Sequence, residues 1–176
     1  PETAPDGQPG TSIVLSLPVP LREPIGARAV GFLTTADVFR RLLAEARKSV
    51  KIFSPYVDPS LTALAQAAKA PIQVVSTLRE ARQKSSPVLE RFATTRPMAV
   101  RYLHEKHAKS QMFQLHAKMV LSDDSGAYVG SANFTDTSLN YNFELGLYIQ
   151  DAAIIAQLHA IFDYIFDFAA KPAEQL

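Results

Sequence analysis

The sequence predicts a single α/β domain whose strands run mostly parallel. Between residues 34 and 102, helical and strand patterns alternate in the order helix, strand, helix, strand. Strands separated by a helix pair in parallel through right-handed crossovers. A length of 176 residues and a hydrophobic content of 47% are enough for one domain with a sizeable core.

Capping residues and prolines mark the starts of the three helices in this half of the chain. Thr34 or Thr35 offers a side-chain oxygen to cap the first helix, and Asp37 suits the positive end of its dipole. Asp-Pro and Ser-Pro pairs begin the other two, because proline is tolerated at the first helical position. We therefore expect helices at 34–46, 58–69 and 86–94, and strands at 50–54, 72–76 and 99–102.

The second half of the chain is expected to add a hairpin, a further strand and a last helix. The hairpin turn contains Gly126, which can take a positive φ. Strict alternation over 143–149 places Glu144 and Gly146 on the face opposite the apolar side chains. Asp151 then caps an apolar helix that suits either the core or an interface. The strands expected here are 119–121, 127–129 and 143–149.

The beginning of the chain has a different composition. Residues 1–24 are rich in proline, glycine and small polar residues, with one apolar patch at Ile13–Leu17. Repeated proline removes backbone donors and disfavours helix. We expect a linker or extended arm that packs at most one short strand and carries no function, followed by the domain proper at 25–172.

Residues suited to phosphate chemistry lie between His116 and Asn133. If Met119–Leu121 is a strand, the period of two puts His116 and Lys118 on the same face. Such a pair suits a phosphate, because the ammonium can hold non-bridging oxygens while the imidazole attacks phosphorus or exchanges a proton.

The spacing resembles the signature of the phospholipase D superfamily, which is His-x-Lys, four residues, Asp, six residues, Gly-Gly or Gly-Ser, one residue, Asn. Glu144 stands where members carry a further active-site acid. The resemblance implies a mixed, mostly parallel sheet flanked by helices on both faces. The alternative is that these are ordinary strand and turn residues. The matching positions are His116, Lys118, Asp123, Gly130, Ser131 and Asn133.

The resemblance also implies a dimer. Superfamily members generally use two His-Lys motifs facing one phosphodiester, so that one His forms a phosphohistidine and the other protonates the leaving oxygen. This chain has one motif, no internal repeat and about the length of one superfamily half. We therefore expect a homodimer in which two His116 side chains meet near the two-fold axis.

The remaining roles are assigned by the same resemblance. Lys118 and Asn133 of both subunits are expected to hold the phosphate oxygens, with Ser131 adding a hydroxyl. Glu144 is expected to accept a hydrogen bond from the other ring nitrogen of a His116, which fixes its tautomer. Because Lys118 and Asn133 stabilise the charge, the mechanism asks for no metal and no other cofactor.

Asp123 and Gly130 are expected to be structural. If the alternation of the strand persists, Asp123 lies on the opposite side from His116, so we assign it to holding the turn. Gly130 is assigned to close backbone packing.

Two further His-x-Lys spacings precede the motif, at His104 with Lys106 and His107 with Lys109. Neither is followed by the Asp that the signature requires, so we do not assign them to catalysis. These residues are either solvated loop residues or contacts in a substrate groove. His159, on the last helix, is expected at the surface or the edge of the core.

Charge is unevenly distributed along the chain. The segment 69–118 carries ten Lys or Arg against three Glu, whereas the residues after it carry eight acids and one base. A basic segment suits a polyanion, and the small, single-motif, dimeric members of the superfamily resemble bacterial endonucleases. The sequence thus predicts a nuclease acting on DNA, with RNA as a further substrate. The alternatives are a phospholipase D-type lipid phosphodiesterase or transphosphatidylase, a nucleic-acid-binding module without catalysis, and the catalytic module of a larger restriction or defence system.

The absence of cysteine excludes disulfides, thiol catalysis and thiolate metal sites. We find no apolar run long enough to cross a bilayer and no amphipathic membrane-binding segment, and therefore expect no stable membrane insertion. The chain begins at Pro1 rather than Met, so we expect a processed protein or part of a longer one. The cytoplasm and the periplasm of a bacterium both suit this composition.

Overall fold

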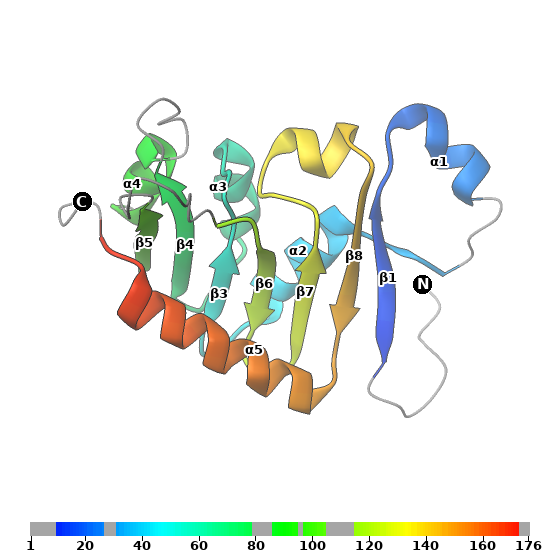
Figure 1. Ribbon diagram of the computed structural model, residues 1–176. Coiled ribbons are helices and arrows are strands. Elements are labelled where there is room, and N and C mark those ends of the chain that lie inside the picture. The colour runs from blue at the N-terminus through cyan, green and yellow to red at the C-terminus, as the bar shows by residue number, and fades with distance from the viewer. Residues whose placement is uncertain (1–9, 27–30, 79–85, 95–96, 105–114, 173–176) are drawn as a thin grey trace, which may run out of the picture.

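An eight-stranded mixed sheet forms the centre of the molecule, in the order β2-β1-β8-β7-β6-β3-β4-β5 (Figure 1). The computed structural model describes residues 10–26, 31–78, 86–94, 97–104 and 115–172. The strands in these ranges are β1 (Thr11–Ser16), β2 (Leu33–Thr34), β3 (Val50–Phe53), β4 (Ile72–Leu78), β5 (Met98–His104), β6 (Lys118–Ser122), β7 (Gly126–Gly130) and β8 (Glu144–Ile149).

Helices cover both faces of the sheet, as the sequence predicts. One face carries α2 (Thr35–Glu45), α3 (Pro59–Ala65) and α4 (Ser86–Ala93). On the other face α5 (Ala152–Tyr164), continued by the π-helical turn η2 (Ile165–Ala169), crosses the strands (Figure 1). Each face has its own cluster of buried apolar side chains.

Parallel pairing is less common than predicted, and the expectation of a mostly parallel sheet is wrong. Among the described strands, three neighbouring pairs are parallel, β1–β2, β3–β4 and β4–β5. Four pairs are antiparallel, β1–β8, β3–β6, β6–β7 and β7–β8. The alternation of helix and strand enforces parallel pairing only in β3 to β5, whereas β6 enters beside β3 in the reverse direction and continues into a hairpin.

The segment predicted as an arm contributes an internal strand. β1 lies between β2 and β8 and pairs with β8 along its whole length, and Val14 is fully buried. A helix, α1 (Val19–Gly26), follows although the repeated prolines disfavour one. Pro20 lies in the first turn of α1, where the missing N–H has no intrahelical partner to lose. Pro24 lies inside the helix.

Side-chain caps begin three of the helices. The Thr34 hydroxyl accepts a hydrogen bond from the Asp37 N–H, which starts α2. The carboxylates of Asp58 and Asp151 accept in the same way at the starts of α3 and α5. α3 ends at Ala65, earlier than predicted.

α5 and η2 together form the one helix in the described ranges that is long and apolar enough to cross a membrane, at Ala152–Ala169. The expectation that no apolar run reaches this length is therefore wrong. Ile155, Phe162 and Phe166 are buried against the sheet. The core helix of a globular domain can pass the same test of length and composition, but only 17% of this window is buried, and its outer side is exposed.

Four neighbouring strands carry the motif and its surroundings to one edge of the sheet. Register places Lys118, at the start of β6, opposite Gly130, at the end of β7. Glu144, at the start of β8, lies opposite Ser16, at the end of β1. We call this end of β6, β7, β8 and β1 the motif edge. The π-helical turn η1 (Thr137–Tyr141) lies in the connection between β7 and β8.

Candidate active site

His116 and Lys118 lie side by side at the motif edge. His116 lies two residues before the first residue of β6 and is exposed, whereas the Lys118 side chain, at the start of β6, is 6% exposed. The Nε2 atom of His116 is 3.1 Å from the Nζ atom of Lys118. Because an ammonium can only donate, Nε2 is the acceptor in this contact and the ring proton belongs on Nδ1. This tautomer carries its lone pair on Nε2, which can attack phosphorus once Lys118 donates to a phosphate oxygen instead.

Burial lowers the pKa of Lys118, and the carboxylate of Glu144 opposes this shift. Desolvation penalises an ammonium that has too little negative charge around it. An incoming phosphate would supply that charge, so the site is electrostatically prepared for an anion.

Glu144 is 8% exposed and is held by two side chains from the motif region. Its carboxylate accepts a hydrogen bond from Ser131 Oγ at 2.5 Å and from Asn142 Nδ2 at 3.2 Å. Ser131 Oγ in turn accepts from the Leu145 N–H at 3.1 Å. Among the hydrogen bonds of the described residues, none joins Glu144 to His116 of the same chain.

Asn133 is held at the edge by the backbone on either side of it. The Ala132 N–H donates to the Tyr128 hydroxyl, and the Phe134 N–H donates to Ser54 Oγ. The Oδ1 atom of Asn133 is buried and has no hydrogen-bond partner within the described ranges. This oxygen can accept a hydrogen bond from a water molecule or a donor on a ligand, whereas a phosphate oxygen would have to be held by the Asn133 Nδ2 donor.

Tyr128 is a residue that sequence reasoning missed. A Cβ atom on Gly130 would lie 2.4 Å from the Tyr128 hydroxyl and 2.7 Å from the Gly146 Cα, so both glycines make room for this ring. Burial raises the pKa of Tyr128 to about 12, against the opposing hydrogen bond from Ala132. The ring thus stays neutral and fixes the backbone from which Ser131 and Asn133 project. Two glycines in register around a strand tyrosine are the signal that could have found it.

With this geometry established, comparison with known proteins identifies the family. The family described as "Cardiolipin synthase, PLD-like domain" matches residues 39–166, which include the whole motif. The chain belongs to this phospholipase D-like family. A probable cardiolipin synthase, YwiE of Bacillus subtilis (strain 168), is 29% identical over 133 residues, which are 73% of this chain and 26% of that protein. The chain therefore spans about a quarter of the length of this relative.

Solved structures confirm the phospholipase D-like fold. NucT from Helicobacter pylori superposes with a TM-score of 0.67 at 16% identity, covering 92% of this chain and 99% of NucT. Nuc, a phospholipase D family member from Salmonella typhimurium, gives 0.67 at 15% identity over 93% and 97%. Phosphatidylserine synthase of Haemophilus influenzae Rd KW20 gives 0.65 at 17% identity over 92% of this chain and 39% of the synthase.

Asp123, the remaining charged position of the phospholipase D-like signature, lies at the far end of β6. Its carboxylate accepts hydrogen bonds from the N–H groups of Arg47, Lys48 and Ser49. Partial burial favours a higher pKa for Asp123, but these three donors and the Lys48 charge outweigh it. The pKa of Asp123 is therefore lowered. These contacts tie the β6–β7 turn to the connection between α2 and β3. The positive φ expected at Gly126 is found at Asp123, at 46°.

A second cluster of the same residue types lies on the opposite face of the sheet. Lys51 of β3 is buried, with Nζ 2.9 Å from His159 Nδ1 and 2.6 Å from Asp163 Oδ1. The Nε2 atom of His159 is 2.6 Å from the Asp123 carbonyl oxygen. We call Lys51, His159 and Asp163 the helix-anchor cluster, because it joins α5 to the sheet, and His116, Lys118, Ser131, Asn133 and Glu144 the motif-edge cluster.

Of the four candidate groove residues, the structure describes one. His104 is the last residue of β5. Lys106, His107 and Lys109 lie outside the described residues.

Proposed function

We propose that this chain is a metal-independent phosphodiesterase that hydrolyses DNA, and RNA as a further substrate, through a phosphohistidine at His116. The observation that carries the proposal is the exposed His116 imidazole, whose Nε2 faces a buried Lys118 ammonium at 3.1 Å. A nucleophile and a cation in this arrangement match what attack on a phosphodiester requires.

The proposed reaction has two displacement steps. The His116 Nε2 lone pair forms a bond to phosphorus as the bond to the leaving oxygen breaks, and a second His116 protonates that oxygen. The same second imidazole then takes a proton from water, whose oxygen displaces Nε2 from phosphorus. Lys118 and Asn133 hold the non-bridging oxygens in both steps, and Ser131 adds a hydrogen bond.

A second copy of the chain is proposed to supply the second His116. A row of apolar side chains on β7, β8 and β1 supports this, because Val129, Leu147 and Ile13 lie in register and are each more than a third exposed. Leu145, beside Glu144 at the motif edge, is 53% exposed. α5 crosses this face of the sheet without covering the row (Figure 1). The row lies on the α5 face, opposite the side chains of Lys118 and Glu144, and reaches the motif edge at Leu145. A two-fold dimer through the row would bury it and bring the motif edges of the two copies together at the ends of these strands.

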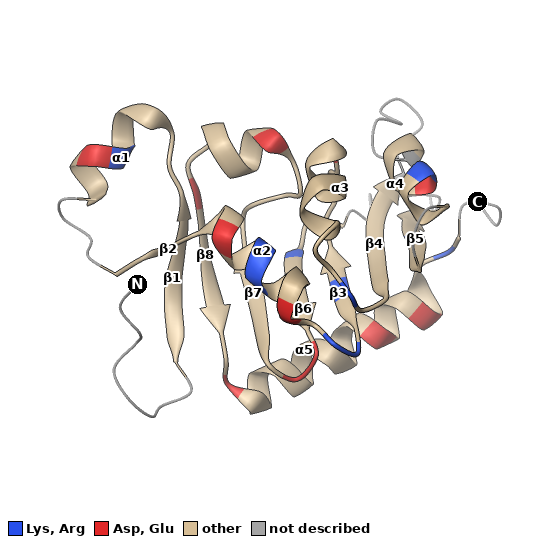
Figure 2. Cartoon of the chain, turned by 180° about the vertical axis from the view of Figure 1, so that it is seen from behind, with Lys and Arg blue, Asp and Glu red and all other residues tan. Residues whose placement is uncertain are grey.

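The outer side of α5 extends this apolar surface. Ile154, Ile161, Tyr164 and Phe168 are exposed, and Figure 2 shows the helix uncoloured apart from acidic segments. We propose that this side of α5 belongs to the same interface. In such a dimer Glu144 of one copy would orient the His116 of the assembled site, a contact that the single chain does not make.

A nucleic-acid substrate is supported by charge. The basic segment 69–118 suits a polyanion. The second candidate, a phospholipase D-type lipid phosphodiesterase or transphosphatidylase, is favoured by the similarity to a probable cardiolipin synthase. A binding module without catalysis would not need His116 and Lys118 together.

One set of assays tests the proposal. The purified protein in EDTA is incubated with plasmid DNA, single-stranded DNA, RNA, and vesicles of phosphatidylcholine or phosphatidylglycerol. His116→Ala is the inactive control and His159→Gln the matched control, because both histidines contact a lysine. We expect nucleic-acid cleavage that persists in EDTA and disappears only in His116→Ala. Cleavage that needs a divalent metal, or turnover of lipid alone, would overturn the proposal.

The dimer is tested separately by sedimentation. Leu145→Glu places a charge in the exposed row and is expected to shift the dimer towards monomer and to reduce activity in parallel. Val19→Glu alters an exposed apolar residue outside the row and should change neither. A wild-type monomer with full activity would contradict a shared site.

A further inference from the structure

We infer that a cavity beside Glu144 binds an unpaired nucleobase of the substrate strand, an inference that rests on the proposed nuclease function. The cavity has a volume of about 390 Å³ and lies between the end of β1, α1, the start of α2 and η1. Ser16, Arg22, Phe32 and Leu139 are among the residues that line it. None of these positions belongs to the family signature.

The cavity is joined to the motif edge on two sides. Ser16, in its wall, is the direct ladder partner of Glu144. Leu139 and Asn140, on the opposite wall, belong to η1, and Asn142 just after η1 donates to the Glu144 carboxylate. Ser16 stands three strands from Lys118 and two residues further along the strand direction, a separation of about 16 Å at the usual spacings. A ligand in the cavity would therefore lie near the scissile phosphate without covering it.

An unpartnered polar group indicates that the cavity has a ligand. The Ser16 side chain is 3% exposed, and its Oγ atom has no hydrogen-bond partner within the described ranges. A buried hydroxyl without a partner costs free energy, so such groups in native proteins call for a reason. A hydrogen bond to a bound ligand would supply it.

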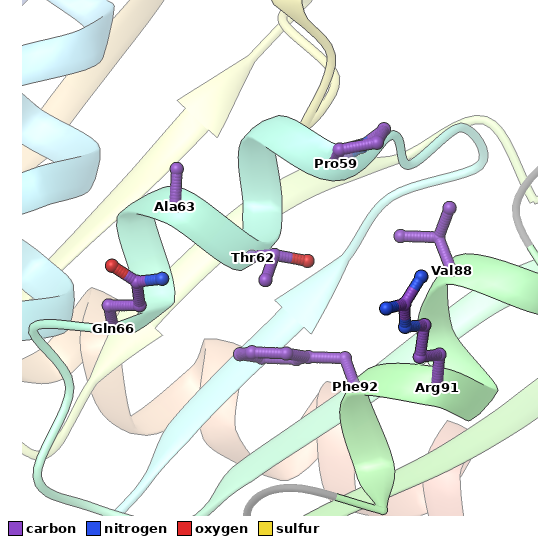
Figure 3. Close-up of a pocket in the computed structure, with 7 residues that line it drawn as sticks. All are labelled: Pro59, Thr62, Ala63, Gln66, Val88, Arg91 and Phe92. Atoms are coloured by element: carbon purple, nitrogen blue, oxygen red, sulfur yellow. The ribbon is translucent and has the colours of Figure 1, made fainter.

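A cavity of similar size elsewhere lacks this feature. The groove between α3 and α4 has a volume of about 400 Å³ and is lined by Thr62, Gln66, Arg91 and Phe92, among others (Figure 3). None of the unpartnered buried polar atoms found in the described ranges belongs to its lining. The α3–α4 groove is therefore a matched control for the cavity beside Glu144.

The lining favours a nucleobase over a phosphate or an acyl chain. Arg22 is the one charged residue among the described residues that line the cavity, and its side-on donors are already used, from Nε to the Leu17 carbonyl at 3.0 Å and from Nη2 to the Asn140 carbonyl at 3.3 Å. Most of the lining is apolar, which suits a base better than a doubly coordinated phosphate. The hydroxyl of Ser16 and the guanidinium are poorly matched to an acyl chain. A base combines a flat apolar face, suited to Phe32 and the guanidinium plane, with polar edges suited to Ser16.

The first test locates the base by fluorescence. His116→Ala protein is titrated into single-stranded oligonucleotides that each carry 2-aminopurine at a different position. We expect a change in emission at one position near the bound phosphate, and its loss when Leu139→Trp fills the cavity. Ala63→Trp, in the α3–α4 groove, should leave the change intact. Thermal unfolding of each variant verifies that it is folded.

The second test uses cleavage by the wild-type chain. Removing the base at the located position should lower kcat/KM about 10-fold, in line with the strength of base stacking. Leu139→Trp should cleave the intact and the abasic strand equally well. If nucleic acid is cleaved equally well whichever base is removed, the inference about the cavity is overturned but the proposed function is not. If no nucleic acid is cleaved at all, the proposed function is overturned. Slower turnover of short-chain phosphatidylglycerol in Leu139→Trp would assign the cavity to lipid and also overturn the inference.

Discussion

His116 and His159 each contact a lysine ammonium, at 3.1 Å and 2.9 Å, and each cluster also contains an acid. In the helix-anchor cluster both ring nitrogens of His159 have partners, and Lys51 also bonds Asp163. In the motif-edge cluster His116 is exposed, and within the described ranges hydrogen bonding is seen only at its Nε2.

Residue types alone therefore do not identify a site. Saturated hydrogen bonds hold a helix in place, whereas a group with unused donors or acceptors at a surface can take a substrate. At the motif edge the Asn133 oxygen has no partner within the described ranges, and one hydrogen bond is seen there for the Lys118 ammonium, which has three donors. Substituting equivalent members of the two clusters should separate activity from stability.

The histidines should give the largest contrast. His116→Ala removes the proposed nucleophile, and we expect activity to fall by about 10³-fold or more with little change in unfolding free energy, because the ring is exposed. His159→Gln should retain activity. Its free energy of unfolding should fall by about 1 kcal/mol, because the hydrogen bonds of His159 to Lys51 and to the Asp123 carbonyl are lost. Initial rates and urea unfolding of both variants measure this. Equal losses of activity would break the comparison.

The lysines should show the same separation with a smaller effect on rate. Lys118→Met is expected to lower kcat by about 10²-fold, since it removes a donor to the developing charge on phosphate. Lys51→Met should leave kcat unchanged and destabilise the fold by about 1–3 kcal/mol, since His159 and Asp163 lose a shared donor. If Lys51→Met abolishes activity while the protein remains folded, the helix-anchor cluster has a function beyond structure.

The acids of the two clusters should show the same separation, with a smaller effect on activity than the lysines. Glu144→Gln keeps the shape of the side chain but weakens its hold on a histidine, so we expect activity to fall by about 10- to 100-fold. Asp163→Asn should leave activity unchanged and cost at most about 1 kcal/mol of unfolding free energy, because the amide oxygen can still accept from Lys51 and the carboxylate it replaces is half exposed. The pH profile of kcat/KM distinguishes an orienting role, which should shift the profile, from simple loss of folded protein, which should only scale it.

Alternation in β8 illustrates how far the sequence could predict the site. The period of two correctly separates Glu144 from Leu145, but it does not reveal which side is buried. In the structure Glu144 is 8% exposed and Leu145 is 53% exposed, the reverse of what their polarity suggests. The helices over each face decide burial, and α5 leaves Leu145 uncovered. The chemistry of the motif was readable because its spacing is local, whereas coverage depends on elements far along the chain.

Long-range partners account for the other differences. Asp123 was assigned to its own turn, yet its acceptors serve the N–H groups of residues about 75 positions earlier. No local pattern reports such a contact. For β1 the sequence predicted no more than one short strand within an extended arm. The proline and glycine around its short apolar run favour an arm, and local patterns do not show that this run pairs with β8. The cavity at Ser16 was missed for the same reason.

Asp123 gives the smallest effect and a defined pH dependence. Its pKa is lowered in the folded state, so its ionised form stabilises the fold above the ordinary Asp value of about 3.9, and this contribution is lost as the pH falls below that value towards the folded pKa. Asp123→Asn should therefore cost about 1 kcal/mol at pH 7 and progressively less below pH 3.9. Urea unfolding at both pH values measures the difference. Asp124→Asn, at an exposed neighbour, should show neither effect, and a cost for Asp123→Asn that is independent of pH would mean that shape rather than charge joins the β6–β7 turn to the α2–β3 connection.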